Sequence, residues 1–173
     1  MNDPTPRWTD GPIVSVGLLI ARVLVGGLFV FAGVIKLQDP QQFAFSVAAF
    51  KIFPEGAIGD PLTLLATFAF PWAEILLGAM LILGVWTRSA ALLTVLLLAG
   101  FIGAITSVLV REMSVTCGCF GKIDFICGET LGVCSIIRNS VMLGITLLPL
   151  ALGSGQFGID GLLRWWNEKN NAA

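Results

Sequence analysis

Four cysteines are the residues of this 173-residue chain whose type and spacing best suit chemistry: Cys117, Cys119, Cys127 and Cys134. Two cysteines that flank one residue can close a small, strained disulfide where the chain turns sharply, and Gly118 permits such a turn. Strained, accessible disulfides exchange readily with thiols. Cys117 and Cys119 are therefore the candidate catalytic pair of a thiol–disulfide exchange site.

The same cysteines allow other interpretations. Cys117 or Cys119, paired with Cys127 or Cys134, can form static disulfides that staple a long connection in an oxidising compartment. Cys134 lies one turn into an apolar segment, where a buried, unreactive thiol is the common outcome. The spacing is not the paired CxxC pattern of zinc sites and the chain has no His, so no metal site is predicted.

The composition indicates which elements hold this loop. Hydrophobic residues make up 56% of the chain and charged residues 12%, with a mean hydropathy of +0.90, whereas about a quarter of the residues in soluble domains are charged. The chain is therefore predicted to be an all-α integral membrane protein, with residues 1–173 forming one membrane domain in the lipid bilayer. A net charge of -1 and scattered Lys and Arg residues exclude nucleic-acid binding.

Four apolar segments are long enough to cross the roughly 30 Å of hydrocarbon in a bilayer. They cover about residues 13–37, 62–86, 89–110 and 131–150, which predicts a four-helix bundle with the cysteine loop between its third and fourth helices. Lys and Arg residues are shared equally between the two sides, so the positive-inside rule does not orient the bundle.

Shorter features fall between and within these spans. After Asp39-Pro40, apolar residues at helical spacing, Phe43 and Val47 among them, predict either a short amphipathic helix on the membrane surface or an ordered loop. Pro71 predicts a kink in the second span, and Thr87-Arg88 a tight connection to the third. In the C-terminal tail, four apolar side chains are expected to rest on the membrane surface: Leu162, Leu163, Trp165 and Trp166.

Ionisable groups inside a span need a partner, because unpaired charge is costly in hydrocarbon. Arg22 and Glu74 fall near mid-membrane in antiparallel neighbours, and we predict that they pair. Such a pair either fixes the register of the helices or makes Glu74 a carboxylate that handles protons.

Other polar residues lie nearer the cysteine loop. Arg138 and Asn139 follow that loop by about two turns and indicate a polar group beneath it, which can be Glu74, loop carbonyls or a carbonyl-bearing ligand such as a quinone. Lys36 lies at the same membrane face as the cysteines. It either extends its ammonium to the interface or binds a cofactor, for which a quinone is the candidate.

Several of these residues together resemble the DoxX/MauE superfamily, with the MauE branch of methylamine-utilisation membrane proteins the closer match. The resemblance covers roughly residues 15–150. It rests on the pattern Arg22…Phe29…Gly33-x-x-Lys36-Leu37-x-Asp39-Pro40, on Glu74 and Gly78, and on Cys117-Gly118-Cys119-Phe120-Gly121 followed by Arg138-Asn139.

The resemblance implies a multi-pass protein of the bacterial inner membrane with its cysteine loop on the periplasmic side. MauE-like proteins are associated with maturation of a disulfide-rich periplasmic dehydrogenase subunit, and DoxX-like relatives with quinone-linked sulfur metabolism. Carried over by residue, it implies that Cys117 and Cys119 are the redox pair. It also implies a polar core of four residues: Arg22, Glu74, Arg138 and Asn139. Cys127 and Cys134 depart from the family pattern and can hold the first two cysteines in static bridges.

Two functions follow as hypotheses. The first is a membrane thiol–disulfide redox protein that passes oxidising or reducing equivalents between a periplasmic disulfide-containing partner and the membrane, with quinone as the candidate acceptor. The alternative is a non-catalytic accessory subunit packed against a larger membrane electron-transfer complex, its cysteines only stapling the loop. A transporter is disfavoured, because the four short-looped spans contain no inverted repeat.

Overall fold

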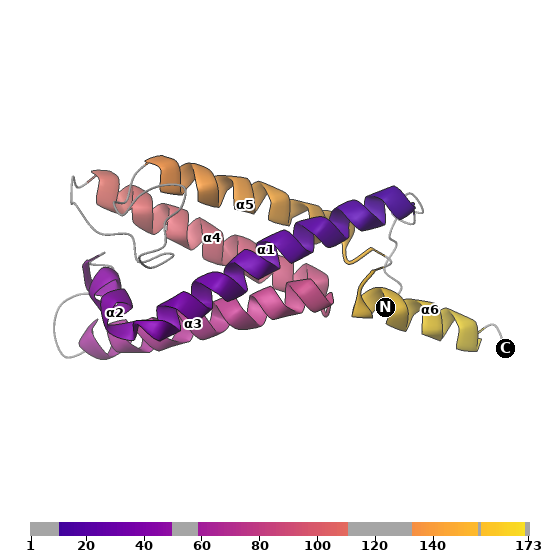
Figure 1. The fold of residues 1–173 in the computed structure, drawn as a ribbon, viewed down its shortest axis with the longest axis horizontal. Helices are drawn as coiled ribbons and strands as arrows, with labels where there is room; N and C mark the ends of the chain where they lie inside the picture. The colour runs from indigo at the N-terminus through magenta and orange to yellow at the C-terminus, as the bar shows by residue number, and fades with distance from the viewer. Residues whose placement is uncertain (1–10, 50–58, 111–132, 156, 172–173) are drawn as a thin grey trace.

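The computed structural model describes residues 11–49, 59–110, 133–155 and 157–171. Within these ranges the secondary structure is helical: α1 (Pro12–Gln38), α2 (Pro40–Ala49), α3 (Gly59–Leu83), α4 (Thr87–Val110), α5 (Val133–Leu152) and α6 (Ile159–Asn171). Four long helices lie side by side, with α2 beside the start of α3 and α6 extending from the opposite end (Figure 1).

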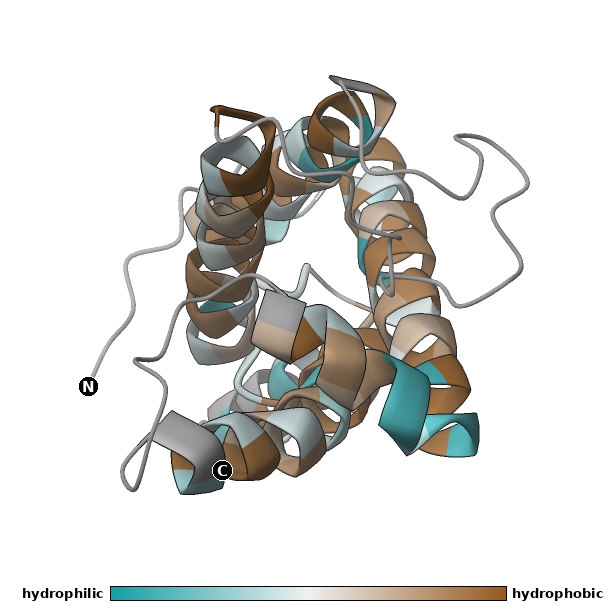
Figure 2. Cartoon of the chain, turned by 90° about the vertical axis from the view of Figure 1, so that its left-hand side faces the viewer, coloured by the Kyte–Doolittle hydropathy of each residue, from teal (hydrophilic) through white to brown (hydrophobic). Residues whose placement is uncertain are grey.

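Four of the described helices are long and apolar enough to cross a membrane: α1, α3 from Pro61, α4, and α5 from Cys134. Their outward faces carry exposed large apolar side chains, such as Leu64 and Leu96, and apolar colouring dominates all four spans (Figure 2). Lipid tolerates such faces, whereas water does not. The predicted all-α bundle of four spans is confirmed.

Glycines bring α1 and α3 into close contact. A Cβ atom on Gly26 would lie 2.6 Å from the carbonyl oxygen of Gly78, and one on Gly33 would lie 2.7 Å from the carbonyl oxygen of Pro71. Small residues at both positions let the two backbones approach, as is common between helices in membranes. Moving seven residues forward along α1 therefore means moving seven residues back along α3, which sets an antiparallel register.

The helices α4 and α5 form a second close pair, and the core lies where the two pairs meet. Buried residues from all four spans make up this core: Val25, Phe29, Leu81, Ala90, Ala91, Leu98 and Met142. The bundle is thus two antiparallel helix pairs with an apolar seam between them.

The connection between α3 and α4 differs from the prediction. The helix α3 ends at Leu83 instead of Trp86, because Gly84 adopts φ +69° and the amides of Gly84 and Val85 both donate to the Met80 carbonyl. This geometry is a glycine C-cap. Thr87 and Arg88 belong to the first turn of α4, so the tight connection is Gly84–Trp86. Pro71 lies within α3, which continues through it as one helix.

The segment after the first span, for which the sequence predicts either a short helix or an ordered loop, is the helix α2. Asp39 ends α1, and its side chain accepts a hydrogen bond from the Gln42 amide at 3.1 Å, which caps the start of α2. Phe43 and Val47 are buried against Ala66 of α3. The described apolar face of α2 therefore packs on the bundle.

The two ends of the bundle carry different features. The cysteine end of the bundle is formed by the last turn of α1, by α2, and by residues 110 and 133, between which the cysteine loop runs. The tail end of the bundle is formed by the start of α1, by Gly84–Trp86, and by residues 153–155 and 157–160. In the tail, α6 is a helix with exposed Leu162 and Leu163. Contact of this helix with a membrane surface stays a prediction.

Candidate functional site

Lys36 and Glu74 form a buried ion pair inside the bundle. The ammonium of Lys36, in the last turn of α1, donates a hydrogen bond to Glu74 Oε1 on α3. Both side chains are only 3% exposed. The prediction that Lys36 extends to the membrane interface is wrong, since its charge turns inward to a carboxylate.

The glycine register explains this pairing. Gly33 packs against Pro71, Glu74 and Ile75, and Lys36 follows Gly33 by one turn on the same face of α1. Side chains on a helix point back towards its N-terminus, so the Lys36 ammonium returns to the level of Gly33. There it meets Glu74.

The predicted pair between Arg22 and Glu74 is wrong for the same reason. Arg22 lies opposite Leu81 and Ile82 on α3, and its Nε and Nη2 donate to their carbonyl oxygens at 2.8 and 3.1 Å. Glu74 is eight residues from Ile82, about 12 Å along a helix that rises about 1.5 Å per residue. The depth of each residue within its own span does not include this offset between the two helices.

Arg22 instead closes the tail end. Its Nη1 donates to the carbonyl oxygens of Ser154 at 2.7 Å and Phe157 at 3.0 Å, which lie between α5 and α6. The side chain is 0% exposed. Because the last carbonyls of a helix have no partner within it, Arg22 serves as a cap for α3 and as a tie to the tail.

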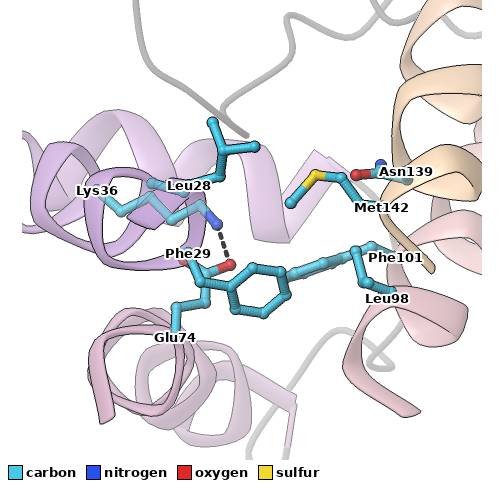
Figure 3. A pocket seen from close by; sticks show the side chains of 9 residues that line it. Leu28, Phe29, Lys36, Glu74, Leu98, Phe101, Asn139 and Met142 are labelled. Atoms are coloured by element: carbon cyan, nitrogen blue, oxygen red, sulfur yellow. Dashed lines mark hydrogen bonds and ion pairs between the residues drawn. The ribbon is translucent and has the colours of Figure 1, made fainter. Parts of the chain in front are cut away.

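A small pocket adjoins the Lys36–Glu74 pair, in the seam between the two helix pairs (Figure 3). All four spans line it, with Leu28, Phe29, Ala32, Lys36, Glu74, Leu98, Phe101, Asn139 and Met142. It has room for a water molecule. The side-chain amide of Asn139 lies across the pocket from the ion pair (Figure 3). Three polar side chains, those of Lys36, Glu74 and Asn139, therefore line one mainly apolar pocket.

The two charges of the pair are stabilised to different extents. The Lys36 ammonium also lies 4.9 Å from the ring centre of Phe101 and 5.3 Å from that of Phe43, both within cation–π range. The second carboxylate oxygen of Glu74, Oε2, is buried and has no hydrogen-bond partner among the described residues. The cation is well surrounded, and the anion has one oxygen left to satisfy.

Of the predicted polar core, the structure brings Glu74 and Asn139 to one pocket and places Arg22 elsewhere. Arg138 precedes Asn139 on α5 and does not line the pocket. Within the described residues, the ion pair of Glu74 is with Lys36 and not with Arg138. A role for Arg138 towards loop carbonyls or a ligand stays a prediction.

Cys117, Cys119 and Cys127 lie outside the described residues, as does the loop that carries them. Cys134, the second residue of α5, is exposed and disulfide-bonded. The expectation of a buried, unreactive thiol at this position is therefore wrong.

The aromatic partners of Lys36 were not predicted from the sequence. Phe43 was recognised only as part of an apolar helical face, and Phe101 lies in the uniformly apolar α4. A phenylalanine among many apolar residues gives no signal that it faces a cation. The packing of α2 and α4 around the end of α1 supplies that information.

Comparisons with known proteins give one result. A search of curated proteins and a search of solved structures each found no match. The family model described as methylamine utilisation protein MauE matches residues 14–152, which cover the four spans except for the first two residues of α1 and include the ion pair. The wider likeness to DoxX proteins stays a prediction. Membership in the matched family fits a membrane protein of methylamine utilisation, and over these residues the chain belongs to the MauE family.

Proposed function

We propose that this protein is a membrane thiol–disulfide redox protein that supports the oxidation or maturation of a periplasmic partner. The observation that carries the proposal is the position of a buried polar site on the side of the bundle where the cysteine loop joins α4 and α5. The MauE match fits a membrane protein of methylamine utilisation, and the Cys117-Gly118-Cys119 sequence supports thiol–disulfide chemistry. Localisation in a bacterial inner membrane, with this loop outside, belongs to the same proposal.

The proposed reaction is a disulfide exchange. A thiolate of the partner attacks one sulfur of a Cys117–Cys119 disulfide, which breaks that bond and forms a mixed disulfide. The second partner thiol then attacks the mixed disulfide, so the partner leaves oxidised and Cys117 and Cys119 are left as two thiols. Two electrons and two protons have moved from the partner to this protein.

Another turnover requires an electron acceptor. A quinone in the bilayer is the proposed acceptor: the two thiols become a disulfide, and the quinone becomes a hydroquinone by taking two electrons and two protons. The balance is complete without a metal.

The disulfide at Cys134 supports a rival proposal, in which the protein is an accessory subunit of a larger membrane complex. A bridge from the start of α5 into the loop is what a structural staple requires. The two proposals differ in the partners of Cys117 and Cys119, which must be bonded to each other for exchange and are bonded elsewhere in a staple.

The pairing and sidedness of the cysteines test these proposals first. Intact cells are labelled with a membrane-impermeant maleimide before and after mild reduction, and the labelled peptides are mapped by mass spectrometry. Labelling of Cys117 and Cys119 only after mild reduction supports exchange at the outer face. If Cys117 and Cys119 are bonded to Cys127 and Cys134 in bridges that resist reduction, the accessory-subunit proposal takes precedence.

Turnover tests the reaction itself. The full-length protein in lipid nanodiscs is mixed with a reduced two-thiol peptide and a short-chain benzoquinone, and hydroquinone formation is measured above the protein-free rate. Cys117→Ser and Cys119→Ser should each abolish the protein-dependent rate. Gly103→Ala, at a position with nothing within 4 Å, is the control that should retain it. Full activity in both serine variants contradicts the proposal.

A further inference from the structure

One oxygen of the Lys36–Glu74 pair has no hydrogen-bond partner among the described residues. Glu74 is 2% exposed, its Oε1 is bonded to Lys36, and its Oε2 is buried with no hydrogen-bond partner among the described residues. A carboxylate oxygen is an acceptor, so the missing partner must be a hydrogen-bond donor. The adjoining pocket has room for a water molecule, which is such a donor.

The surroundings of Lys36 allow the charge on Glu74 to change. Two aromatic ring centres lie within 5.3 Å of the ammonium, and Lys36 occupies the last turn of α1, where the helix dipole favours a cation. None of these contacts involves Glu74, so protonation of Glu74 does not itself remove them. Lys36 therefore does not depend on the negative charge of Glu74 alone.

Among the described residues that line the pocket, Lys36 is the one ionisable side chain besides Glu74. The described helix α2 contains no ionisable residue. On α4, Arg88 lies at the tail end, near Gly153. On α5, Asn139 lines the pocket, and its neighbour Arg138 does not. Among the described residues, a change in the protonation of Glu74 is thus opposed mainly by the charge of Lys36, which the aromatic rings also stabilise.

We propose that Glu74 is a proton-exchange site inside the membrane span, with a water molecule in the pocket as its hydrogen-bond donor. One solvent proton is transferred through this water to Oε2, so the carboxylate becomes a carboxylic acid and Lys36 stays an ammonium. Release reverses the transfer, and the pair alternates between a net charge of zero and +1. The inference does not depend on chemistry at Cys117 and Cys119, although quinone-linked thiol oxidation moves protons that such a site can carry.

Infrared difference spectroscopy tests this inference on the full-length protein in lipid nanodiscs. Spectra are recorded between alkaline and acidic buffer, in H₂O and in D₂O. The expected result is a carboxylic-acid C=O band that appears on acidification, shifts in D₂O and is lost in Glu74→Gln. Identical carboxyl regions in the folded wild type and the folded Glu74→Gln variant would mean a static ion pair and would overturn the proposal.

Two further variants keep the test decisive. Asp39→Asn removes an exposed carboxylate and should leave the band in place, which separates Glu74 from surface carboxylates. Glu74→Asp keeps an ionisable group and should displace the band, which covers the case in which the glutamine variant does not fold. A band that neither displaces in Glu74→Asp nor disappears in Glu74→Gln belongs to another residue and overturns the assignment.

The water is tested separately, through Asn139. Asn139→Leu removes the amide across the pocket and leaves the ion pair intact. Hydrogen–deuterium exchange of the Glu74 band should then slow several-fold after mixing with D₂O. An unchanged exchange rate would show that the proton does not pass through the pocket. Because the readout is spectroscopic, failure of this inference is distinguishable from failure of the thiol chemistry.

Discussion

Arg22 and Lys36 are both buried cations on α1, at opposite ends of one bundle, and they are satisfied in different ways. Arg22 donates to four backbone carbonyls, which are neutral and cannot gain or lose a proton in this chemistry. Lys36 faces a carboxylate and two aromatic rings. The Arg22 guanidinium, hydrogen-bonded to carbonyls, holds the backbone in place. The Lys36 ammonium instead allows a titratable carboxylate, Glu74, to be buried within the span.

The comparison extends to the carboxylates. Asp160 at the tail end accepts hydrogen bonds from the Trp86 amide and from both the amide and the hydroxyl of Thr87. Glu74 has one oxygen with no partner among the described residues. Full satisfaction indicates a structural role, whereas a buried oxygen without a partner beside a pocket needs a hydrogen-bond donor that the described residues do not supply, which is the premise of the proposed proton exchange at Glu74. We therefore expect substitutions at the tail end to alter stability, and those near Glu74 to alter function as well.

The largest effect is expected for Arg22→Met. The change leaves four carbonyl acceptors at the tail end without the guanidinium, and charge-assisted hydrogen bonds contribute about 1.5–3 kcal/mol each, so a loss on the order of 5 kcal/mol is expected. Unfolding by SDS in mixed micelles, followed by circular dichroism, measures it. The stability of Arg22→Lys should fall between that of the wild type and that of Arg22→Met, since an ammonium cannot reach all four carbonyls. Unfolding of Arg22→Met at the wild-type SDS fraction would contradict a clamp at this residue.

Lys36→Met ranks second. Glu74 must then either bury an unpaired charge or bind a proton at neutral pH, and breaking a buried ion pair costs about 3 kcal/mol or more. Adding Glu74→Gln should recover most of that loss, because the neutral amide needs no counter-charge. The same SDS titration, applied to both single variants and to the double variant, gives the coupling free energy between Lys36 and Glu74. A double variant no more stable than Lys36→Met would show that the two side chains are not coupled.

The sequence predicted the number of spans, the presence of polar groups among them and the family, because hydrophobic length and a few motif residues carry that information. It did not predict which charges pair. Arg22, Lys36 and Glu74 were recognised individually, but their partners depend on the register of α1 against α3, which the contact of Gly26 with Gly78 sets. Gly100 and Gly103 cannot be told apart from Gly26 and Gly78 by sequence, yet a Cβ atom added to either would have nothing within 4 Å.

That contrast among glycines gives the third prediction. Gly26→Val places a side chain where a Cβ would already lie 2.6 Å from the Gly78 carbonyl oxygen, so α1 and α3 must separate, and about 2 kcal/mol of stability should be lost. Gly103→Val is the matched control, with open space at the same kind of residue in another span. Separation of α1 from α3 should also weaken the Lys36–Glu74 pair, which the infrared band of Glu74 reports. Equal stability losses in both valine variants would mean that helix propensity, and not close packing, is the cause.

The smallest effect is expected for Asp160→Ala, which removes the carboxylate that caps α4 and leaves the four carbonyl acceptors of Arg22 in place. Loss of an N-cap costs about 1 kcal/mol, and the Trp86 and Thr87 amides lose their acceptor. Trp86 has a φ of +45°, unfavourable for a side chain of its size, so the carboxylate also holds the Gly84–Trp86 turn in place. Hydrogen exchange should accelerate at the Trp86 and Thr87 amides and remain unchanged around Glu74. Accelerated exchange near Glu74 as well would show that the two ends are coupled, and would remove the distinction between a fixed end and a titratable one.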